Sequence, residues 1–141
     1  MKVSTILATK AAHVVTIQPE APVSRAVELY NEHDIGALIV VNAEEAVVGI
    51  LSERDIVRRL NQYESILDVP VQELMTPRVI VGRPNDDLIS IVHTMTEKRF
   101  RHLPIVDNGR LIGMISIGDV VKAQRDQYSG EITTLEAQIM A

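Results

Sequence analysis

The sequence predicts an α/β (α+β) fold in which two similar halves each combine a small β-sheet with helices. The first observation is an internal repeat, since residues 15–57 align with residues 80–121. The second is the spacing of apolar residues, which alternates between helical periodicity and short runs rich in Val and Ile. The third is the composition, because 3% aromatic residues and no Trp leave the core to aliphatic side chains. The repeat carries most weight, since self-similarity of this kind determines the architecture.

The N-terminal half reads as short helix, strand, helix, strand, strand, helix. A short helix is predicted at residues 3–7 and a strand at residues 15–19. The next helix shows the apolar stripe at i, i+3, i+4 and i+7, formed by Val23, Ala26, Val27 and Tyr30. Strands at residues 38–42 and 49–51 follow, joined by a turn at residues 43–46, and the last helix begins after Ser52.

The C-terminal half repeats this order. Its short helix is predicted at residues 71–75 and its first strand at residues 80–84. The matching helical stripe consists of Leu88, Ile91, Val92 and Met95. The Asn108-Gly109 pair between two β-rich runs predicts a tight hairpin, one residue shorter than the turn in the first half.

The domain boundaries follow from the repeat. We expect residues 1–60 and 71–123 to form the two repeats, residues 61–70 to link them, and residues 124–141 to form a helical tail. A unit of about 60 residues buries only a marginal core by itself. The two halves are therefore expected to pack on each other, about a pseudo-twofold axis and through their sheets.

Composition excludes several classes of protein. The chain has 141 residues and no Cys, so disulfides, thiolate metal sites and a Cys nucleophile are absent. A net charge of −5 and the few aromatic residues argue against nucleic acid as a partner, although the basic stretch at residues 98–102 is the kind of feature an RNA-binding protein would use. The apolar runs are far shorter than the ~20 residues of a membrane span, so we expect a cytoplasmic protein without a membrane partner.

Both halves carry the pattern Gly-h-h-Ser-x-x-Asp, where h is apolar, at residues 49–55 and 113–119. Ser-x-x-Asp before an apolar helix is typical of a capping box, which stabilises a helix start and implies no ligand. The duplication does not decide the matter, because a duplication copies caps and binding sites alike. Gly in the preceding strand permits close approach of a backbone or a ligand.

These two motifs, with Leu-Met-Thr-Pro at residues 74–77 and His-Leu-Pro-Ile-Val at residues 102–106, resemble a tandem pair of CBS domains, also called a Bateman module. The resemblance runs from about Val3 to Lys122 and is closest to stand-alone bacterial CBS-pair proteins. It implies a βαββα fold in each half, with adenosyl compounds such as AMP, ATP, NAD(H) or S-adenosylmethionine in clefts between the halves. No catalytic domain flanks the pair, so the resemblance implies a regulatory protein that is not an enzyme.

The resemblance also assigns roles to residues of two sites. Asp55 and Asp119 would accept hydrogen bonds from the two ribose hydroxyls, and Ser52 and Ser116 would hold a phosphate at a helix N-terminus. The second site, which we expect to be the stronger, consists of Ile80, Phe100, Arg101, His102, Ser116 and Asp119. The first site consists of Val15, Ile35, Gly36, Ala37, Ser52, Arg54 and Asp55.

The two sites differ in charge. Arg101 and His102 stand where the first half has Gly36 and Ala37, so only the second half supplies cations for a phosphate at this place. The alternative is that residues 98–101 form a solvated basic loop.

The adenine face is expected at Ile80 and Phe100 in the second half and at Val15 and Ile35 in the first. The aliphatic residues also fit an ordinary core, and Phe100 fits either a base-stacking role or a plug between the halves.

Other chemistry has weak support. The four His residues show no metal-ligand spacing, no Ser has a recognisable His and Asp partner set, and no Gly-rich phosphate loop occurs, so we expect no metal, no catalytic residue and no catalytic cofactor. A homodimer is expected instead. Its seam would follow the tail residues Tyr128, Ile132, Leu135 and Ile139, unless this tail packs back onto its own sheet.

Two functions remain open at this stage. The first is a sensor of adenine nucleotides that signals to an unknown regulated protein or across the dimer. The second is a structural or interaction scaffold, in which the Ser and Asp residues act only as caps.

Overall fold

The computed structural model describes the backbone of residues 1–9 and 14–140, and side chains of these residues as far as Ser129. The first part of the chain forms α1 (Val3–Thr9), β1 (Thr16–Ile17), α2 (Val23–His33), β2 (Ala37–Val41), β3 (Val47–Ser52) and α3 (Glu53–Arg59). The second part forms α4 (Val71–Leu74), α5 (Leu88–Lys98), β4 (His102–Asp107), β5 (Arg110–Ser116) and α6 (Ile117–Met140). The prediction of two helix-and-strand repeats with a C-terminal helix is confirmed.

Each half has its own small sheet. In the first half β1 pairs in parallel with β2, and β2 pairs antiparallel with β3. In the second half β4 and β5 form the hairpin, and Gly82 takes the place of a first strand through a single parallel bridge to Ile105. The strand predicted at residues 80–84 is therefore reduced to one bridge, held by Gly82 N donating to Pro104 O at 2.8 Å and Val106 N donating to Gly82 O at 2.9 Å.

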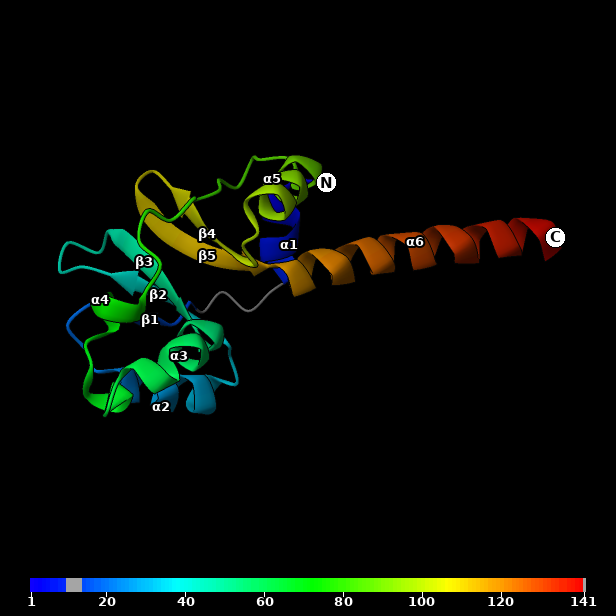
Figure 1. Cartoon of the computed structure of the whole chain (residues 1–141). Helices are drawn as coiled ribbons and strands as arrows, with labels where there is room; N and C mark the ends of the chain where they lie inside the picture. Colours follow the sequence, from blue (N-terminus) through cyan, green and yellow to red (C-terminus); the bar gives the residue numbers. More distant parts are fainter. Residues whose placement is uncertain (10–13, 141) are drawn as a thin grey trace.

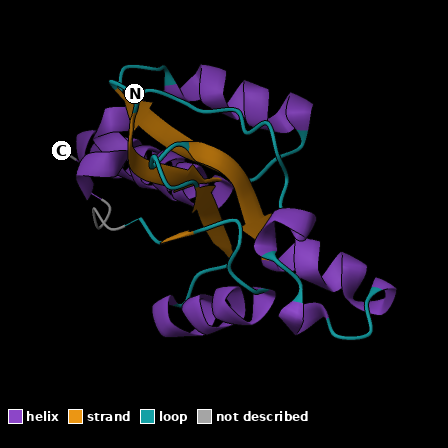
Figure 2. Ribbon diagram, turned by 90° about the vertical axis from the view of Figure 1, so that its left-hand side faces the viewer, coloured by secondary structure: helices purple, strands orange, loops and turns teal. Residues whose placement is uncertain are grey.

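The two sheets lie in the middle of the molecule, with α5 outside one of them and α2 and α3 outside the other (Figures 1 and 2). Along β2, Leu38 and Val40 belong to the first core, whereas Ile39 points to the opposite face and is also fully buried. On β4, Leu103 and Ile105 belong to the second core, and the alternating Pro104 is buried as well. Burial on both faces means that the halves pack through their sheets, as expected from the sequence.

The short helix at the start of each half packs against the other half. α1 contributes Val3 and Ile6 to the second core, and Val3 N donates to Asp86 O at 3.0 Å. α4 contributes Val71 and Leu74 to the first core, where Val71 N donates to Ala21 O at 2.8 Å. The halves are thus interlocked by an exchange of their first helices.

The predicted linker is partly structured. It holds two short 3-10 helices, η1 (Leu60–Gln62) and η2 (Ile66–Asp68). Ile66 is buried in the first core, and Val23 N of α2 donates to Val69 O at 2.9 Å. Residues 66–69 therefore form part of the first core.

The turns follow the predicted chemistry. Asn108 and Gly109 have φ values of 51° and 77°, as expected for the two-residue hairpin between β4 and β5. In the longer turn between β2 and β3, Asn42 Oδ1 accepts hydrogen bonds from Glu44 N and Ala46 N, both at 3.0 Å. Asp87 caps α5 by accepting a hydrogen bond from Ser90 N at 3.3 Å.

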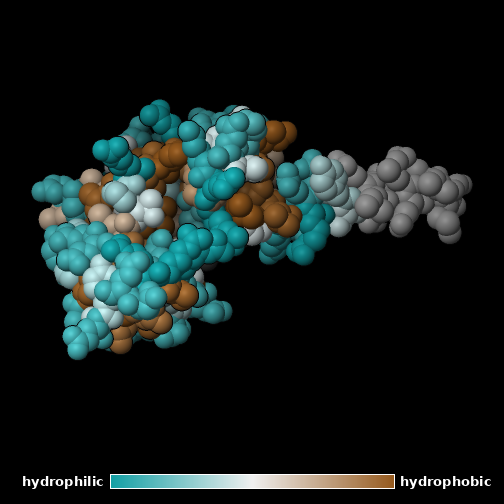
Figure 3. All heavy atoms as spheres, viewed as in Figure 1, coloured by the Kyte–Doolittle hydropathy of each residue, from teal (hydrophilic) through white to brown (hydrophobic). Residues whose placement is uncertain are grey.

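α6 is the longest helix and projects from the body (Figure 1). In the part of α6 with described side chains, Val121 and Tyr128 are exposed apolar residues. Over the face of the molecule seen in Figure 3, hydrophobic residues form separate patches. The seam residues Ile132, Leu135 and Ile139 lie outside the described side chains. None of the helices in the described part of the chain combines the length and the hydropathy of a membrane span.

Candidate functional site

Both Ser-x-x-Asp motifs form helix caps. In the first half Ser52 N donates to Asp55 Oδ2 at 2.8 Å, and Ser52 Oγ donates to the same oxygen at 3.0 Å. Asp55 N donates to Ser52 Oγ at 3.3 Å, which completes a capping box at the start of α3. In the second half Ser116 N donates to Asp119 Oδ2 at 2.9 Å, and Asp119 N donates to Ser116 Oγ at 3.1 Å. The capping interpretation is therefore confirmed. A cap does not exclude that the same Ser and Asp residues also bind a ligand.

The start of the second strand of each half lies against this cap. Glu53 N donates to Gly36 O at 3.0 Å, and Ile117 N donates to Arg101 O at 2.9 Å. In the sheets Ala37 lies opposite Ser52, and His102 lies opposite Ser116. Each half thus gathers four of the predicted site residues at one end of its hairpin: Gly36, Ala37, Ser52 and Asp55 in the first, Arg101, His102, Ser116 and Asp119 in the second.

Gly49 and Gly113 are needed for packing between chain segments. A Cβ at Gly49 would lie 2.5 Å from Met75 Sδ and 3.0 Å from Thr76 O, because residues 75–76 run beside β3. A Cβ at Gly113 would lie 2.7 Å from Leu7 Cδ2 of α1. The expected close approach at these glycines is present, and the approaching groups belong to the exchanged segments of the protein.

The charged residues around the second hairpin end are exposed. Lys98, Arg99 and Arg101 all reach solvent, while His102 is half-buried. Arg99 ends α5 with a left-handed φ of 57°, as Asp34 ends α2 with a φ of 53°. In the first half Arg54 is exposed as well. The basic segment predicted from the sequence therefore lies at the surface, as both a phosphate site and a solvated loop require.

Tyr30 is a buried polar group next to the first cap. Its hydroxyl donates to Leu51 O at 2.8 Å, one residue before Ser52. Burial raises the pKa of the Tyr30 phenol strongly above its ordinary value, and the nearby Asp55 and Glu53 charges raise it further. Tyr30 therefore remains neutral and fixes α2 to the end of β3.

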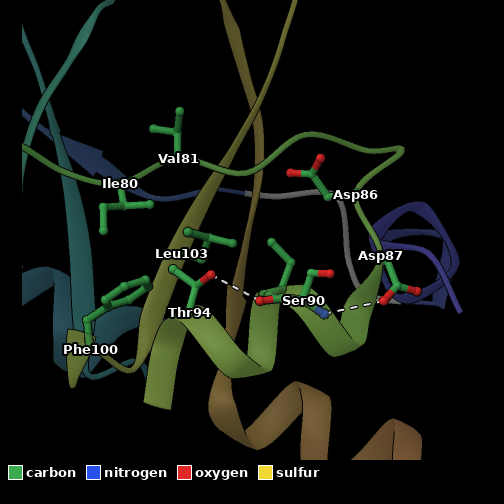
Figure 4. A pocket seen from close by; sticks show the side chains of 9 residues that line it. Ile80, Val81, Asp86, Asp87, Ser90, Thr94, Phe100 and Leu103 are labelled. Carbon is green, nitrogen blue, oxygen red and sulfur yellow. Dashed lines mark hydrogen bonds between the residues drawn. The ribbon is translucent and has the colours of Figure 1, made fainter. Parts of the chain in front are cut away.

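The predicted adenine-facing residues lie in two different settings. Val15 and Ile35 are half-buried and pack against the first core. Ile80 and Phe100 line a surface hollow of about 350 Å³ between α5 and the segment before it (Figure 4). Arg101, His102, Ser116 and Asp119 are not among the lining residues. The predicted second site is thus divided in two. Ile80 and Phe100 line the hollow, whereas the four polar residues lie at the hairpin end, and the two parts meet where Phe100 precedes Arg101 in the chain.

Sequence reasoning missed the polar residues of this hollow, which are Asp86, Asp87, Ser90 and Thr94. The available signal was a difference between the halves, because the aligned positions in the first half are Ala21, Pro22, Arg25 and Leu29. Within the described residues, no three His, Asp or Glu side chains gather as a metal site would require.

Comparisons with known proteins agree with this architecture. The family model described as "CBS domain" matches residues 3–62 and again residues 71–126. An uncharacterised 17.7 kDa protein of Acidianus ambivalens is 35% identical over 129 residues, which cover 91% of this chain and 76% of that protein. The crystal structure of a CBS-domain containing protein from Agrobacterium tumefaciens is 40% identical, with a TM-score of 0.82 over 87% of this chain and 92% of that one. The structure of the CBSX2 protein in complex with AMP is 28% identical, with a TM-score of 0.75 over 90% of this chain and 98% of that one.

Proposed function

The chain belongs to the CBS-domain family as a tandem pair, and on this premise we propose that it is a regulatory module, without enzymatic activity, that binds an adenine nucleotide. The nucleotide is AMP, ATP or NAD(H), and its occupancy is read by a partner protein or across a homodimer. A ligand shifts such an equilibrium only by its different affinity for the two states of the protein.

The observation that carries this proposal is the group at the second hairpin end. Arg101 and His102 lie at the start of β4, beside the N-terminus of α6, where Ser116 and Asp119 form the cap. Helix N-termini favour anions, and Arg donors suit phosphate oxygens. A carboxylate next to them is suited to the ribose hydroxyls. The AMP complex of the CBSX2 protein supports the choice of an adenine nucleotide.

The first hairpin end is the weaker candidate. Gly36 and Ala37 take the places of Arg101 and His102, so this end lacks their cations. We therefore expect Asp119 to matter more for nucleotide affinity than Asp55.

Calorimetric titration of the full chain with AMP, ATP, NADH and S-adenosylmethionine tests the proposal. We expect saturable binding of at least one of the adenine nucleotides. Because Asp119 also caps α6, Asp119→Asn is the better variant than Asp119→Ala, since an amide oxygen can still accept the hydrogen bond from Ser116 N. The variant should weaken binding more than Asp55→Asn does. Absence of binding by AMP, ATP and NADH would overturn the proposal, whether or not S-adenosylmethionine binds.

The caps themselves favour a second candidate, a scaffold without a small-molecule ligand, in which all Ser and Asp residues of the motifs serve only α3 and α6. Thermal unfolding separates the two functions. A protein that binds AMP gains stability with AMP concentration by mass action, whereas a scaffold unfolds at the same temperature throughout.

A further inference from the structure

The hollow beside α5 has features that the nucleotide proposal does not use. We call it the α5 hollow and define it by its lining residues: Ile80, Val81, Asp86, Asp87, Ser90, Ile91, Thr94, Phe100 and Leu103. Its volume of about 350 Å³ lies within the range of small-molecule sites. Figure 4 shows Ile80 and Phe100 at one end, Asp86 at the other, and Ser90 and Thr94 on α5 between them. The hollow is therefore apolar at one end and acidic at the other.

The first half fills or changes the same positions. Leu29 aligns with Thr94 and is only 7% exposed, as part of the first core. Arg25 aligns with Ser90 and pairs with Glu28 at 2.9 Å on the surface. The two carboxylates of the hollow have no counterpart in the first half, where Ala21 and Pro22 align with Asp86 and Asp87. The polar lining of the α5 hollow thus belongs to the second repeat and is not shared by the aligned positions of the first.

The hydrogen bonds described for the two carboxylates come from backbone N–H groups. Asp86 Oδ2 accepts a hydrogen bond from Arg83 N at 2.8 Å, and Asp87 Oδ2 accepts one from Ser90 N at 3.3 Å. Lys2 is a bridge partner of Asp87 through the backbone. In the described part of the chain, however, no cationic side chain forms an ion pair with Asp86 or Asp87. Among the described residues, the acidic end thus carries negative charge that no cationic side chain pairs with.

We propose that the α5 hollow binds a small organic cation, with its ammonium group at Asp86 and its apolar body against Ile80 and Phe100. The N-terminus of α5 offsets part of the charge of its cap Asp87. The charge of Asp86 therefore does most to select an amine over a neutral or acidic analogue, because a charge-assisted hydrogen bond is stronger than a neutral one. The hydroxyl of Ser90 provides a further acceptor on the same side. The apolar body gains affinity from the surface it buries.

This site shares Ile80 and Phe100 with the predicted adenine face, but it includes none of the residues predicted for the phosphate and the ribose. The phosphates of a nucleotide would meet repulsion from Asp86 and Asp87, and Ser116, Asp119 and Arg101 do not line the hollow. The proposal does not rest on nucleotide binding, so the two can fail independently.

The test uses the full chain with three probes of one shape: 2-phenylethylamine, 2-phenylethanol and 3-phenylpropionate. We expect the amine to bind more tightly than the alcohol, and the acid not to bind. In methyl-labelled protein, the amine should shift the NMR signals of Ile80, Val81, Ile91 and Leu103 above all others. Equal binding of amine and alcohol, or shifts spread over residues outside the hollow, would overturn the proposal.

Three variants test which residues of the hollow contact the amine. Asp86→Asn should weaken amine binding about tenfold, as expected for the loss of a charged partner. Glu97→Gln removes an exposed carboxylate from the same helix, outside the hollow, and should leave binding unchanged. Thr94→Leu copies the first half and should remove binding by filling the hollow. Equal weakening by Asp86→Asn and Glu97→Gln would reduce the effect to general charge attraction and overturn the proposal. AMP titrated separately into the same samples reports on the nucleotide proposal alone.

Discussion

Ser52 and Asp55 hold each other in a reciprocal cap, in which Asp55 Oδ2 accepts hydrogen bonds from both the backbone N and the Oγ of Ser52. At Ser116 and Asp119 the two backbone bonds of such a cap recur, since Ser116 N donates to Asp119 Oδ2 and Asp119 N donates to Ser116 Oγ. The residues assigned to ribose and phosphate therefore already contribute to stability. A loss of function at these positions has to be separated from a loss of folding.

Ser52→Ala and Asp55→Ala should each lower the free energy of unfolding by about 1 kcal/mol, the usual effect of a lost helix cap. Because both residues belong to one capping box, the double variant should cost less than the sum of the single ones. Urea unfolding of the four proteins measures this. Additive costs would contradict a shared cap.

Arg101→Ala should weaken AMP binding about tenfold, since a hydrogen bond to a charged group typically contributes about 1.5–3 kcal/mol. Arg110→Ala is the matched control, because Arg110 is an exposed cation at the start of β5, at the far end of the hairpin from Ser116. Calorimetry at one fixed salt concentration gives both affinities. Equal losses in the two variants would point to long-range attraction and away from a contact at Arg101.

Gly49→Ala should be more destabilising than Gly113→Ala. The new Cβ at position 49 meets a backbone oxygen, Thr76 O, at 3.0 Å in addition to Met75 Sδ, whereas at position 113 it meets only the end of the Leu7 side chain. Overpacking typically costs about 1–3 kcal/mol, and a flexible side chain can move away. Thermal unfolding compares the two variants, and an equal or reversed order would disagree with this packing.

The protein should lose stability at alkaline pH through Tyr30. Its pKa in the folded state is raised above the value of about 10 in the unfolded chain. Above that pH the unfolded chain releases a proton that the folded protein keeps, so the free energy of unfolding falls with rising pH, by about 1.4 kcal/mol per pH unit for one group. Below about pH 10 this contribution is fully present.

Tyr30→Phe should remove this slope, at a cost of about 1 kcal/mol at neutral pH for the lost hydrogen bond to Leu51 O. Tyr128→Phe, at an exposed position, is the control and should leave the slope in place. Urea unfolding between pH 8 and 11 measures both variants. An unchanged slope in Tyr30→Phe would count against the role assigned to this phenol.

A chain shortened after Ser129 should be monomeric if the seam at Tyr128, Ile132, Leu135 and Ile139 joins two copies of the protein. Light scattering of the full and shortened chains at high micromolar concentration decides this. A full-length monomer, or a dimer that persists after shortening, would exclude the seam.

Much of the fold was predictable because its signals are local. The hairpin at Asn108 and Gly109 requires two residues with positive φ, and the caps at Ser52 and Ser116 follow from residue types at fixed spacing. The exchange of α1 and α4 was not predictable. Helical periodicity shows that Val3 and Val71 face a core, but it does not show which core.

For the candidate site, the grouping of the polar residues at the hairpin end could be predicted, and the α5 hollow could not. Sheet register brings His102 to Ser116, so the polar group follows from the pairing of β4 with β5. The α5 hollow depends on the distance between α5 and residues 80–87. This distance results from the packing of many side chains, so no single residue predicts it. In the sequence, only the difference between the two halves at the aligned positions marks it, as in the contrast between Leu29 and Thr94.

Because of the exchange of α1 and α4, the segment that follows α4 crosses from one core to the other. Residues 75–82 carry the chain from the first core, where Met75 packs, to the second, where Gly82 pairs with Ile105. Ile80 stands on this crossing. Any rotation of one half against the other must bend or tighten the crossing. A molecule bound against Ile80 would therefore contact a segment that joins the two halves.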